Sequence, residues 1–307
     1  MVERSTLVTG GAGFIGSNLV EELLAKGEGV VVLDNMHTGS LENLKGLEGE
    51  LNVVRADCRQ IPELDLSPEK IYHLGIPSSS PMYKKDPFLV GEALNGFLAV
   101  LELARSCGAR VVYASSSSLY SGLNPPHRED MAIQVTDYYT EARLAMERMA
   151  ELYRKLFGVS SVGLRFFSVY GPKENSKGQY ANIISQFLWD ILKKKTPVIY
   201  GDGSQTRDFV YVKDVVMALR MSMESNYDGI LNVGTAAAHS FNDIIEILSR
   251  SLEPSIKPRY IDNPIKNYVG HTLADTSKAE RVLGFRARYS LEEGIKELIE
   301  YYKGDIL

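Results

Sequence analysis

The first half of the chain alternates between short apolar runs and longer amphipathic segments. Runs rich in valine, leucine and isoleucine cover residues 5–10, 29–35, 51–57, 70–76, 109–116 and 160–171. Apolar residues recur at helical spacing over 14–27, 92–108 and 140–157, and a glycine ends or directly follows each of these segments. Short strands that alternate with helices favour a parallel sheet with both faces covered.

The alternation becomes less regular in the second half of the chain. A polar loop at residues 173–179 interrupts it, and an amphipathic segment at 291–302 lies near the end. The predicted fold class is therefore α/β, with one domain over residues 1–165 and a smaller α/β lobe over 166–307. We expect a segment around 208–235, which contains further apolar runs, to return to the first domain.

Composition and charge exclude several classes of function. The 307 residues carry a formal net charge of −5, whereas a nucleic-acid-binding face needs an excess of basic side chains, so nucleic acid is not an expected partner. The two cysteines, Cys58 and Cys107, form neither a disulfide framework nor a metal-ligand spacing, and no metal is predicted. No apolar run approaches membrane-spanning length, and Met1 leads almost directly into the first strand. We therefore expect no membrane partner and a cytoplasmic location.

The segment "VTGGAGFIGSNL" places three glycines, Gly10, Gly13 and Gly16, between the first predicted strand and the first helix. Such glycines allow a tight turn, a close approach to a pyrophosphate and close helix–strand packing. Asp34 ends the second strand about 20 residues further on, where a carboxylate accepts the ribose hydroxyls and repels a 2′-phosphate. The pattern predicts a bound dinucleotide, NAD rather than NADP. Asp57, after the third strand, is either a ligand of the adenine amino group or a solvated loop residue.

Tyr139 lies at the start of the helix predicted at about 140–157, and Arg143 lies four residues further on. Residues four apart lie on the same face of a helix, one turn from each other. At neutral pH only about one phenol in a thousand is ionised. A nearby positive charge favours the phenolate, and arginine cannot lose its charge. The spacing therefore predicts a tyrosine base. The alternative is an exposed Arg143 that pairs with Glu147.

Several longer motifs run along nearly the whole chain: "TGGAGFIGSNL", "LDNMHTGS", "YASSSSLYSG", "DYYTEARLAMERM", "LRFFSVYGP", "GDGSQTRDFVYVKDVV" and "ADTSKAERVLGF". With these motifs the chain resembles the extended short-chain dehydrogenase/reductases, specifically the nucleotide-sugar epimerases of the UDP-glucose 4-epimerase type. The resemblance implies a Rossmann-type, doubly wound domain that holds NAD and a C-terminal lobe that clamps a nucleoside diphosphate sugar. It also implies a homodimer formed through the helices at 95–107 and 140–157.

The resemblance assigns roles to individual residues. Ser116 binds the reacting sugar oxygen, Tyr139 is the acid/base and Arg143 takes the place of the lysine in a Tyr-x-x-x-Lys pair. Arg207 grips the substrate diphosphate, for which a guanidinium fork is suited; otherwise it is a surface arginine paired with Asp208. Substrate contacts are also expected from Ser168 and Lys177. The expected cofactor-binding residues are Gly10, Gly13, Phe14, Ile15, Gly16, Asp34, Asn35, Asp57, Leu74, Tyr139, Arg143 and Phe167.

The implied reaction is epimerisation of a UDP-hexose at C4 through a transient 4-keto sugar. Related dehydratases and decarboxylases carry a carboxylate close to the active-site hydroxyl, whereas Ser117 and Ser118 stand there in this chain. A second echo, "YGPKENSKGQYAN", resembles heptose 6-epimerases, in which Lys177 would do acid/base work unless it is a solvated loop lysine. The remaining alternatives are a 4-ketosugar reductase and a non-catalytic protein that binds NAD and nucleotide sugars.

At four positions the chain departs from the pattern of the family that it resembles. Arg143 replaces the lysine, and Ala93 stands where an asparagine is usual. Ser168 replaces the asparagine of the "RFFN" motif, and Tyr268 stands where many 4-epimerases have a second diphosphate-binding arginine. All four lie in the predicted pocket, and they are the ground for the alternative of an altered substrate or a lost activity.

Overall fold

The computed structural model describes residues 6–252, 256–263 and 269–306. A seven-stranded parallel sheet forms its centre, with the strand order β11-β6-β5-β4-β1-β2-β3. Its strands are β1 (Thr6–Thr9), β2 (Val30–Leu33), β3 (Leu51–Val54), β4 (Lys70–His73), β5 (Arg110–Ser116), β6 (Ser161–Phe166) and β11 (Gly229–Val233). The order reverses between β1 and β4, which confirms the predicted doubly wound, Rossmann-type fold.

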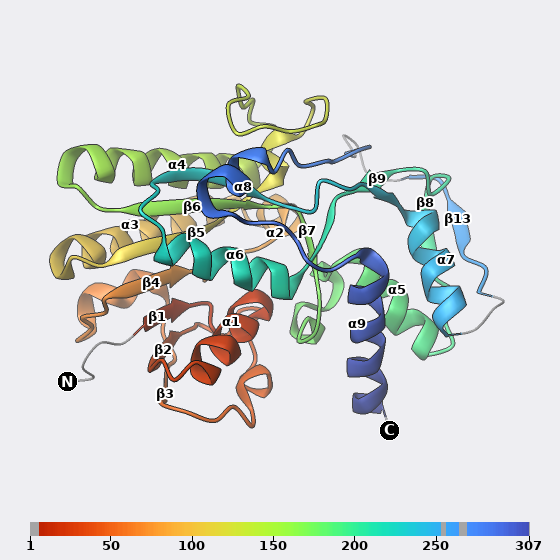
Figure 1. Cartoon of the computed structure of the whole chain (residues 1–307), viewed down its shortest axis with the longest axis horizontal. Helices are drawn as coiled ribbons and strands as arrows, with labels where there is room; N and C mark the ends of the chain where they lie inside the picture. Colours follow the sequence, from red (N-terminus) through yellow and green to blue (C-terminus); the bar gives the residue numbers. More distant parts are fainter. Residues whose placement is uncertain (1–5, 253–255, 264–268, 307) are drawn as a thin grey trace.

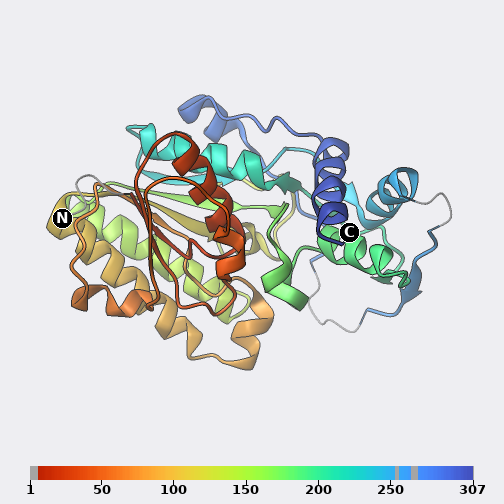
Figure 2. The same ribbon diagram turned by 90° about the horizontal axis from the view of Figure 1, so that it is seen from below.

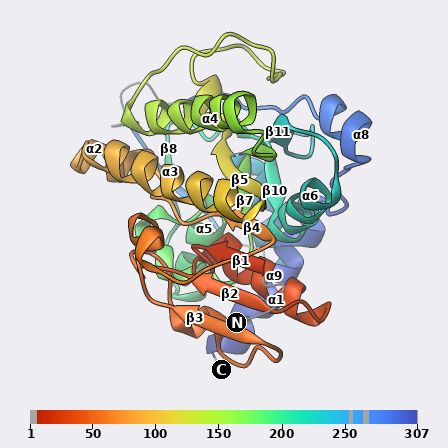
Figure 3. The same cartoon turned by 90° about the vertical axis from the view of Figure 1, so that its left-hand side faces the viewer.

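Helices cover both faces of this sheet, as Figure 3 shows in a view along its edge. The covering helices are α1 (Phe14–Ala25), α3 (Leu89–Cys107), α4 (Tyr138–Phe157) and α6 (Val212–Glu224). Alternate residues of each strand point to opposite faces. Val8 and Val32 therefore join the core under α1 and α6, whereas Leu7 and Val31 join the core under α3 and α4. Burial on both faces explains why these strands read as continuous apolar runs.

A smaller lobe lies beside the sheet, to the right in Figures 1 and 2. Its helices are α5 (Ile183–Leu192), α7 (Phe241–Ser251) and α9 (Leu291–Ile306), which pack around a separate apolar core. Short strand pairs lie outside the seven-stranded sheet: β7 (Ser168–Tyr170) with β10 (Phe209–Tyr211), β8 (Val198–Tyr200) with β13 (Arg259–Ile261), and β9 (Thr206–Arg207) with β12 (His239–Ser240). Two further helices are α2 (Ser80–Lys85) and α8 (Ser277–Leu283).

The chain crosses between the two parts more than once. After the first lobe segment, α6 packs against α1, and β11 adds to the sheet beside β6. Both elements lie within the segment at 208–235. A later crossing was not predicted, because α8 also returns and contacts β11. Within the described ranges, every helix is too short or too polar to span a bilayer.

Candidate active site

A cavity of about 1150 Å³ runs along the carboxyl ends of the parallel strands. It lies where the strand order reverses, the usual ligand position in an open α/β sheet. Asp34 and Asp57 line one end, and Arg207 with the segment Val269–Thr272 lines the other. Its volume exceeds that of a typical single-ligand pocket, so it has room for a dinucleotide and a second ligand.

The glycine turn after β1 has no room for side chains at two of its glycines. Gly10 adopts φ +68°, and a Cβ there would lie 2.6 Å from the backbone of Gly75. A Cβ on Gly16 would lie 2.0 Å from the carbonyl oxygen of Gly10. Gly13 is the N-cap of α1, and no side chain caps this helix end. The first N–H groups of α1, at Phe14 and Ile15, are thus left for an anionic ligand such as a pyrophosphate.

Asp34 is buried at the end of β2 and holds the glycine turn. Its carboxylate accepts the backbone N–H of Ala12 at 3.0 Å and that of Met36 at 2.8 Å. Burial raises the pKa of Asp34 above its ordinary value, against the opposing effect of these hydrogen bonds. Because Asp34 also lines the cavity, it stands where the adenosine ribose of a bound dinucleotide is expected.

Asp57 is a capping residue with several partners. It accepts Asn35 Nδ2 at 3.0 Å and Arg59 Nε at 2.7 Å, and it caps the short 3₁₀ helix Cys58–Glu63. Burial raises its pKa, but the hydrogen bonds from Arg59 and Asn35 outweigh burial, so the pKa is lowered overall. Asp57 is therefore a partly exposed helix cap, and its contact with adenine stays a prediction.

Tyr139 and Arg143 lie together inside the cavity. Their side chains are buried, with 7% and 3% of the residue surface exposed. The guanidinium carbon of Arg143 lies 4.8 Å from the centre of the Tyr139 ring, and Nη2 donates to the carbonyl of Pro77 at 2.8 Å. Nε of Arg143 is buried and has no partner among the described residues. The alternative of an exposed Arg143 paired with Glu147 is wrong, because Glu147 binds Arg165 instead.

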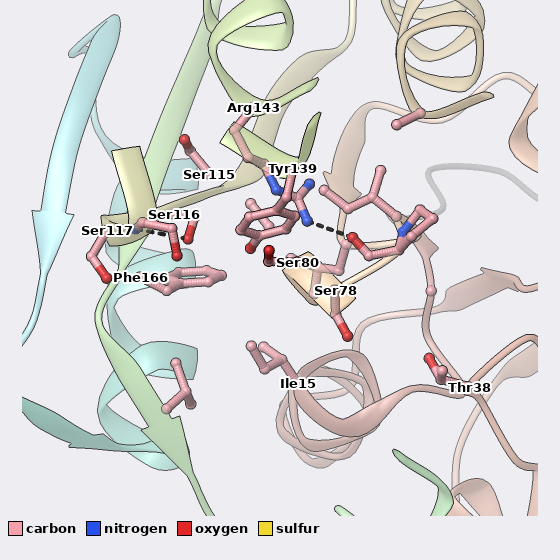
Figure 4. Close-up of a pocket in the computed structure, with 18 of the residues that line it drawn as sticks. Ile15, Thr38, Ser78, Ser80, Ser115, Ser116, Ser117, Tyr139, Arg143 and Phe166 are labelled. Carbon is pink, nitrogen blue, oxygen red and sulfur yellow. Dashed lines mark hydrogen bonds between the residues drawn. The ribbon is translucent and has the colours of Figure 1, made fainter. Parts of the chain in front are cut away.

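Local sequence explains why Tyr139 points into the cavity. Asp137 caps α4 by accepting the N–H of Thr140 at 2.8 Å, which fixes the first turn of the helix. The same carboxylate accepts the hydroxyl of Ser80, from the start of α2. Tyr83 packs edge-on against the Tyr139 ring, with the ring centres 5.5 Å apart. These contacts hold the phenol between the start of α2 and the end of β5 (Figure 4).

Ser116 ends β5 on the other side of Tyr139 in Figure 4. Its Oγ accepts the N–H of Ser118 at 3.1 Å, which leaves the hydroxyl hydrogen for a ligand. The neighbouring Ser115 is engaged differently, because its hydroxyl donates to Glu147 at 2.6 Å. The side chains of Ser117 and Ser118 also line the cavity. Of the serine run, Ser116 is therefore the member best placed to share a sugar oxygen with Tyr139.

A buried polar network behind these residues was not predicted. Arg165 on β6 donates to both carboxylate oxygens of Glu147, at 2.9 and 2.7 Å, and to the hydroxyl of Tyr120 at 2.9 Å. Tyr120 in turn donates to Asn232 on β11 at 2.7 Å. The network joins α4, β6 and β11 behind the cavity. The signal in the sequence was a single arginine within the apolar run at 160–171.

Arg207 and Phe167 both line the far half of the cavity. Arg207 donates to the carbonyls of Val269, at 2.6 Å, and Gly270, at 3.0 Å. Its neighbour Asp208 is buried and accepts backbone N–H groups of other loops, Ala274 among them. Arg207 thus holds the segment that closes this end of the cavity. Phe167 is buried.

The comparison with known proteins decides the family. The model of the NAD dependent epimerase/dehydratase family matches residues 6–234. The chain belongs to this family. A UDP-glucose 4-epimerase of Mycolicibacterium smegmatis is 34% identical to it over 97% of this chain and 98% of that protein. UDP-glucuronic acid decarboxylase 1 of Arabidopsis thaliana is 32% identical over 98% of this chain and 70% of that protein.

A solved structure agrees with this family membership. UDP-glucose 4-epimerase from Thermotoga maritima, solved with UDP-glucose, matches with a TM-score of 0.93 at 29% identity, covering 99% of this chain and 100% of that one. The predicted resemblance to extended short-chain dehydrogenase/reductases that act on nucleotide sugars is confirmed, and so is NAD as the cofactor. The glycine turn, with its open helix end, fits the pyrophosphate of that cofactor.

The departures from the family pattern have structural settings. Ala93 is buried on α3 in the small apolar cluster that holds Tyr83 and Tyr139. The hydroxyl of Ser168 accepts Nδ2 of Asn182 at 3.0 Å, so an amide from α5's N-cap lies near the position of the missing asparagine. Tyr268 lies outside the described residues. Leu74 and Asn35 line the cavity as expected cofactor contacts do.

Two further observations limit the chemistry of the cavity. Within the described ranges, no three His, Cys, Asp or Glu side chains gather in a way that could hold a metal ion. Cys58 lines the cavity, but burial raises the pKa of its thiol to about 12, so it stays protonated at neutral pH. Of the acid/base candidates that the sequence predicts, Tyr139 and Lys177 both line the cavity.

Proposed function

We propose that the protein is a nucleotide-sugar epimerase that inverts C4 of a UDP-hexose through a transient 4-keto sugar. The observation that carries the proposal is the placement of Tyr139. Its phenol is held between Ser116 and Ser80 at the start of α2, and the Arg143 guanidinium lies 4.8 Å from its ring centre. Arginine keeps its positive charge, so a fixed cation lies beside the phenol that exchanges a proton with the sugar hydroxyl.

The residues of the chain divide the work of such a reaction. Tyr139 takes the proton of the 4-hydroxyl, while Ser116 donates a hydrogen bond to the same oxygen. When bound, NAD supplies a hydride acceptor that later returns the hydride. Arg207, whose guanidinium lies at the far end of the cavity, binds the diphosphate while the keto sugar turns. Tyr139 then gives its proton back, so no net oxidation occurs.

Ser117 and Ser118 favour epimerisation over the other reactions of the family. The resemblance places a carboxylate of dehydratases and decarboxylases at or near these positions, to remove a second proton or to assist loss of carbon dioxide. Both residues carry hydroxyls here, and both line the cavity. The carboxylate that those reactions use is therefore replaced by hydroxyls at these two positions, although a decarboxylase is among the relatives of the chain.

A panel of UDP-, ADP- and dTDP-sugars incubated with the purified protein tests this function. We expect NMR to show a new anomeric signal for a UDP-hexose with no added NADH and no loss of bound NAD. Consumption of NAD(P)H in proportion to product would instead show a 4-ketosugar reductase. Turnover only with an ADP-heptose would show a heptose 6-epimerase. Tight binding of UDP-sugars without turnover of any would show a non-catalytic protein.

The same proposal includes a homodimer. On α4, a helix expected at the dimer contact, the side chains of Leu152, Leu156 and Phe157 are 41%, 63% and 51% exposed. Apolar side chains grouped on one helix are costly in water, and a helix of a second subunit would cover them. Light scattering after gel filtration should give twice the mass of the chain, and Leu156→Glu should shift the protein toward monomer.

A further inference from the structure

A segment of the second half of the chain crosses the glycine turn that opens α1. This segment, residues 172–177, is called the strap. The side-chain amide of Asn18, on α1, donates to the carbonyl of Pro172 at 3.1 Å. The amide of Asn43 donates to the hydroxyl of Ser176 at 3.5 Å. The strap is therefore attached to the dinucleotide-binding domain at both of its ends.

Lys177 extends from the end of the strap into the cavity. Its ammonium lies 5.2 Å from the centre of the Phe14 ring, and Phe14 is the first residue of α1. It also lies 2.9 Å from Oε1 of Glu174, and only 16% of the Lys177 side chain is exposed. The solvated-loop alternative for this lysine is therefore wrong.

Glu174 fixes the position of the ammonium. Its side chain is fully buried, and it accepts the hydroxyl of Ser185 at 2.6 Å and the N–H of Asn182 at 2.7 Å. These hydrogen bonds fix the position of the Glu174 carboxylate and therefore that of the ammonium that pairs with it. An ammonium has three N–H groups, and Glu174 uses one of them. Two donors remain for a ligand in the cavity.

The glycine turn itself carries no positive side chain. Residues 8–19 contain neither lysine nor arginine, so the turn offers an anion only its backbone N–H groups and the partial charge of the helix end. Lys177 supplies a full charge beside Phe14. We propose that Lys177 binds the pyrophosphate of NAD from the strap side and thereby keeps the cofactor bound between turnovers.

This role differs from the sugar acid/base role that the heptose 6-epimerase resemblance gives to Lys177. The geometry favours the cofactor because the ammonium lies against the Phe14 ring at the start of α1, and contacts at Asn18 and Asn43 tie the strap to the dinucleotide-binding domain. The proposal requires NAD, which the family establishes, but it does not depend on which sugar the enzyme converts. Failure of the proposed C4 epimerisation would therefore leave it unaffected.

Lys177→Gln tests the proposal, because glutamine still offers Glu174 a hydrogen-bond donor but has no charge. We expect purified Lys177→Gln to retain much less NAD than the wild type. Calorimetry on the NAD-free proteins should show an NAD affinity about tenfold or more below that of the wild type, as for loss of one charged hydrogen bond. UDP affinity should be unchanged. Lys177→Arg, which keeps the charge, should retain most of the NAD.

Lys173→Gln is the matched control. Lys173 belongs to the same strap, but it pairs with Glu21 on the outside of α1, at 2.6 Å, and does not line the cavity. The Lys173→Gln protein should retain as much NAD as the wild type. If Lys173→Gln loses as much NAD as Lys177→Gln, attachment of the strap and not the Lys177 charge holds the cofactor, and the proposal is wrong.

Three other results would also overturn the proposal. The first is a Lys177→Gln protein, folded by circular dichroism, with wild-type NAD affinity. The second is a loss of UDP affinity at unchanged NAD affinity, which would assign Lys177 to the substrate diphosphate. The third is a loss of turnover at unchanged affinity for both ligands, which would assign it to proton transfer at the sugar. A weaker salt dependence of NAD binding in Lys177→Gln than in the wild type would support the proposal.

Discussion

Arg143 and Arg165 are both buried arginines that lie over the ring of a tyrosine. They are 3% and 4% exposed, and their guanidinium carbons lie 4.8 Å from the Tyr139 ring centre and 5.0 Å from that of Tyr120. Their partners differ. Arg165 forms a two-point ion pair with Glu147, whereas the oxygen that Arg143 binds is the carbonyl of Pro77.

The difference follows from the cost of burying a charge. An unpaired buried charge is expensive, and a paired one is tolerated when its hydrogen bonds are satisfied. Burial alone would lower the pKa of Arg165, but the hydrogen bonds to Glu147 outweigh burial and raise it above its ordinary value. The charge of Arg165 is thus neutralised within the fold. Among the described residues no carboxylate pairs with Arg143 and its Nε has no partner, so its charge acts on the Tyr139 ring and on whatever enters the cavity.

The largest expected effect is on stability, at the paired arginine. Arg165→Met leaves the buried carboxylate of Glu147 without its partner, and breaking a buried ion pair in this way costs about 3–5 kcal/mol. Urea unfolding should show this loss. The double variant Glu147→Gln/Arg165→Met should recover part of it, because no charge is then left unpaired. A loss below about 1 kcal/mol in Arg165→Met would remove the distinction between the two arginines.

The next effect is on turnover, at the tyrosine beside the unpaired arginine. Tyr139→Phe removes only the phenol oxygen and should reduce turnover at least ~10²-fold, the low end for a positioned acid/base. UDP affinity should stay unchanged. Ser116→Ala should also be slower, and Ser115→Ala, at a hydroxyl that Glu147 already holds, is its control. Full activity in Tyr139→Phe would make Lys177 the next candidate base.

A third arginine extends the comparison, because Arg207 is held by the carbonyls of Val269 and Gly270. If its charge serves the substrate diphosphate, Arg207→Ala should weaken UDP binding by about 1.5–3 kcal/mol, the usual contribution of a charged hydrogen bond. NAD binding should not change. Calorimetry that shows unchanged UDP affinity would place the diphosphate site elsewhere.

The smallest expected effect distinguishes the charge of Arg143 from its shape. Arg143→Met removes the fixed positive charge beside the phenol that exchanges a proton with the sugar. Turnover at neutral pH should therefore fall by about tenfold or more. Arg143→Lys keeps the charge and should retain measurable activity. A wild-type rate, pH profile and NAD content in Arg143→Met would show that the charge has no part in the reaction.

Much of the fold could be predicted because its signals are local. Apolar runs and helical spacing predicted the strands and helices of the sheet, and glycines at Gly108 and Gly158 marked the ends of α3 and α4. Both glycines adopt left-handed backbone conformations, with φ of 73° and 70°, which glycine accepts without strain. The glycine turn and the spacing of Asp34 likewise depend on adjacent elements, so the sequence was sufficient to predict a dinucleotide site.

The tertiary structure decided which charged groups meet. Helical spacing offered Glu147 to Arg143, four residues away, but β6 packs beside α4 and brings Arg165 into a better two-point geometry. In the same way, the strap brings Lys177 to Phe14, which is far away in sequence. Such contacts depend on how the helices, the sheet and the strap pack together. The local sequence around each residue does not predict them. The sequence by itself determined the elements, the cofactor turn and the tyrosine; only the packing of those elements decided which arginine is neutralised in the core and which keeps its charge for the cavity.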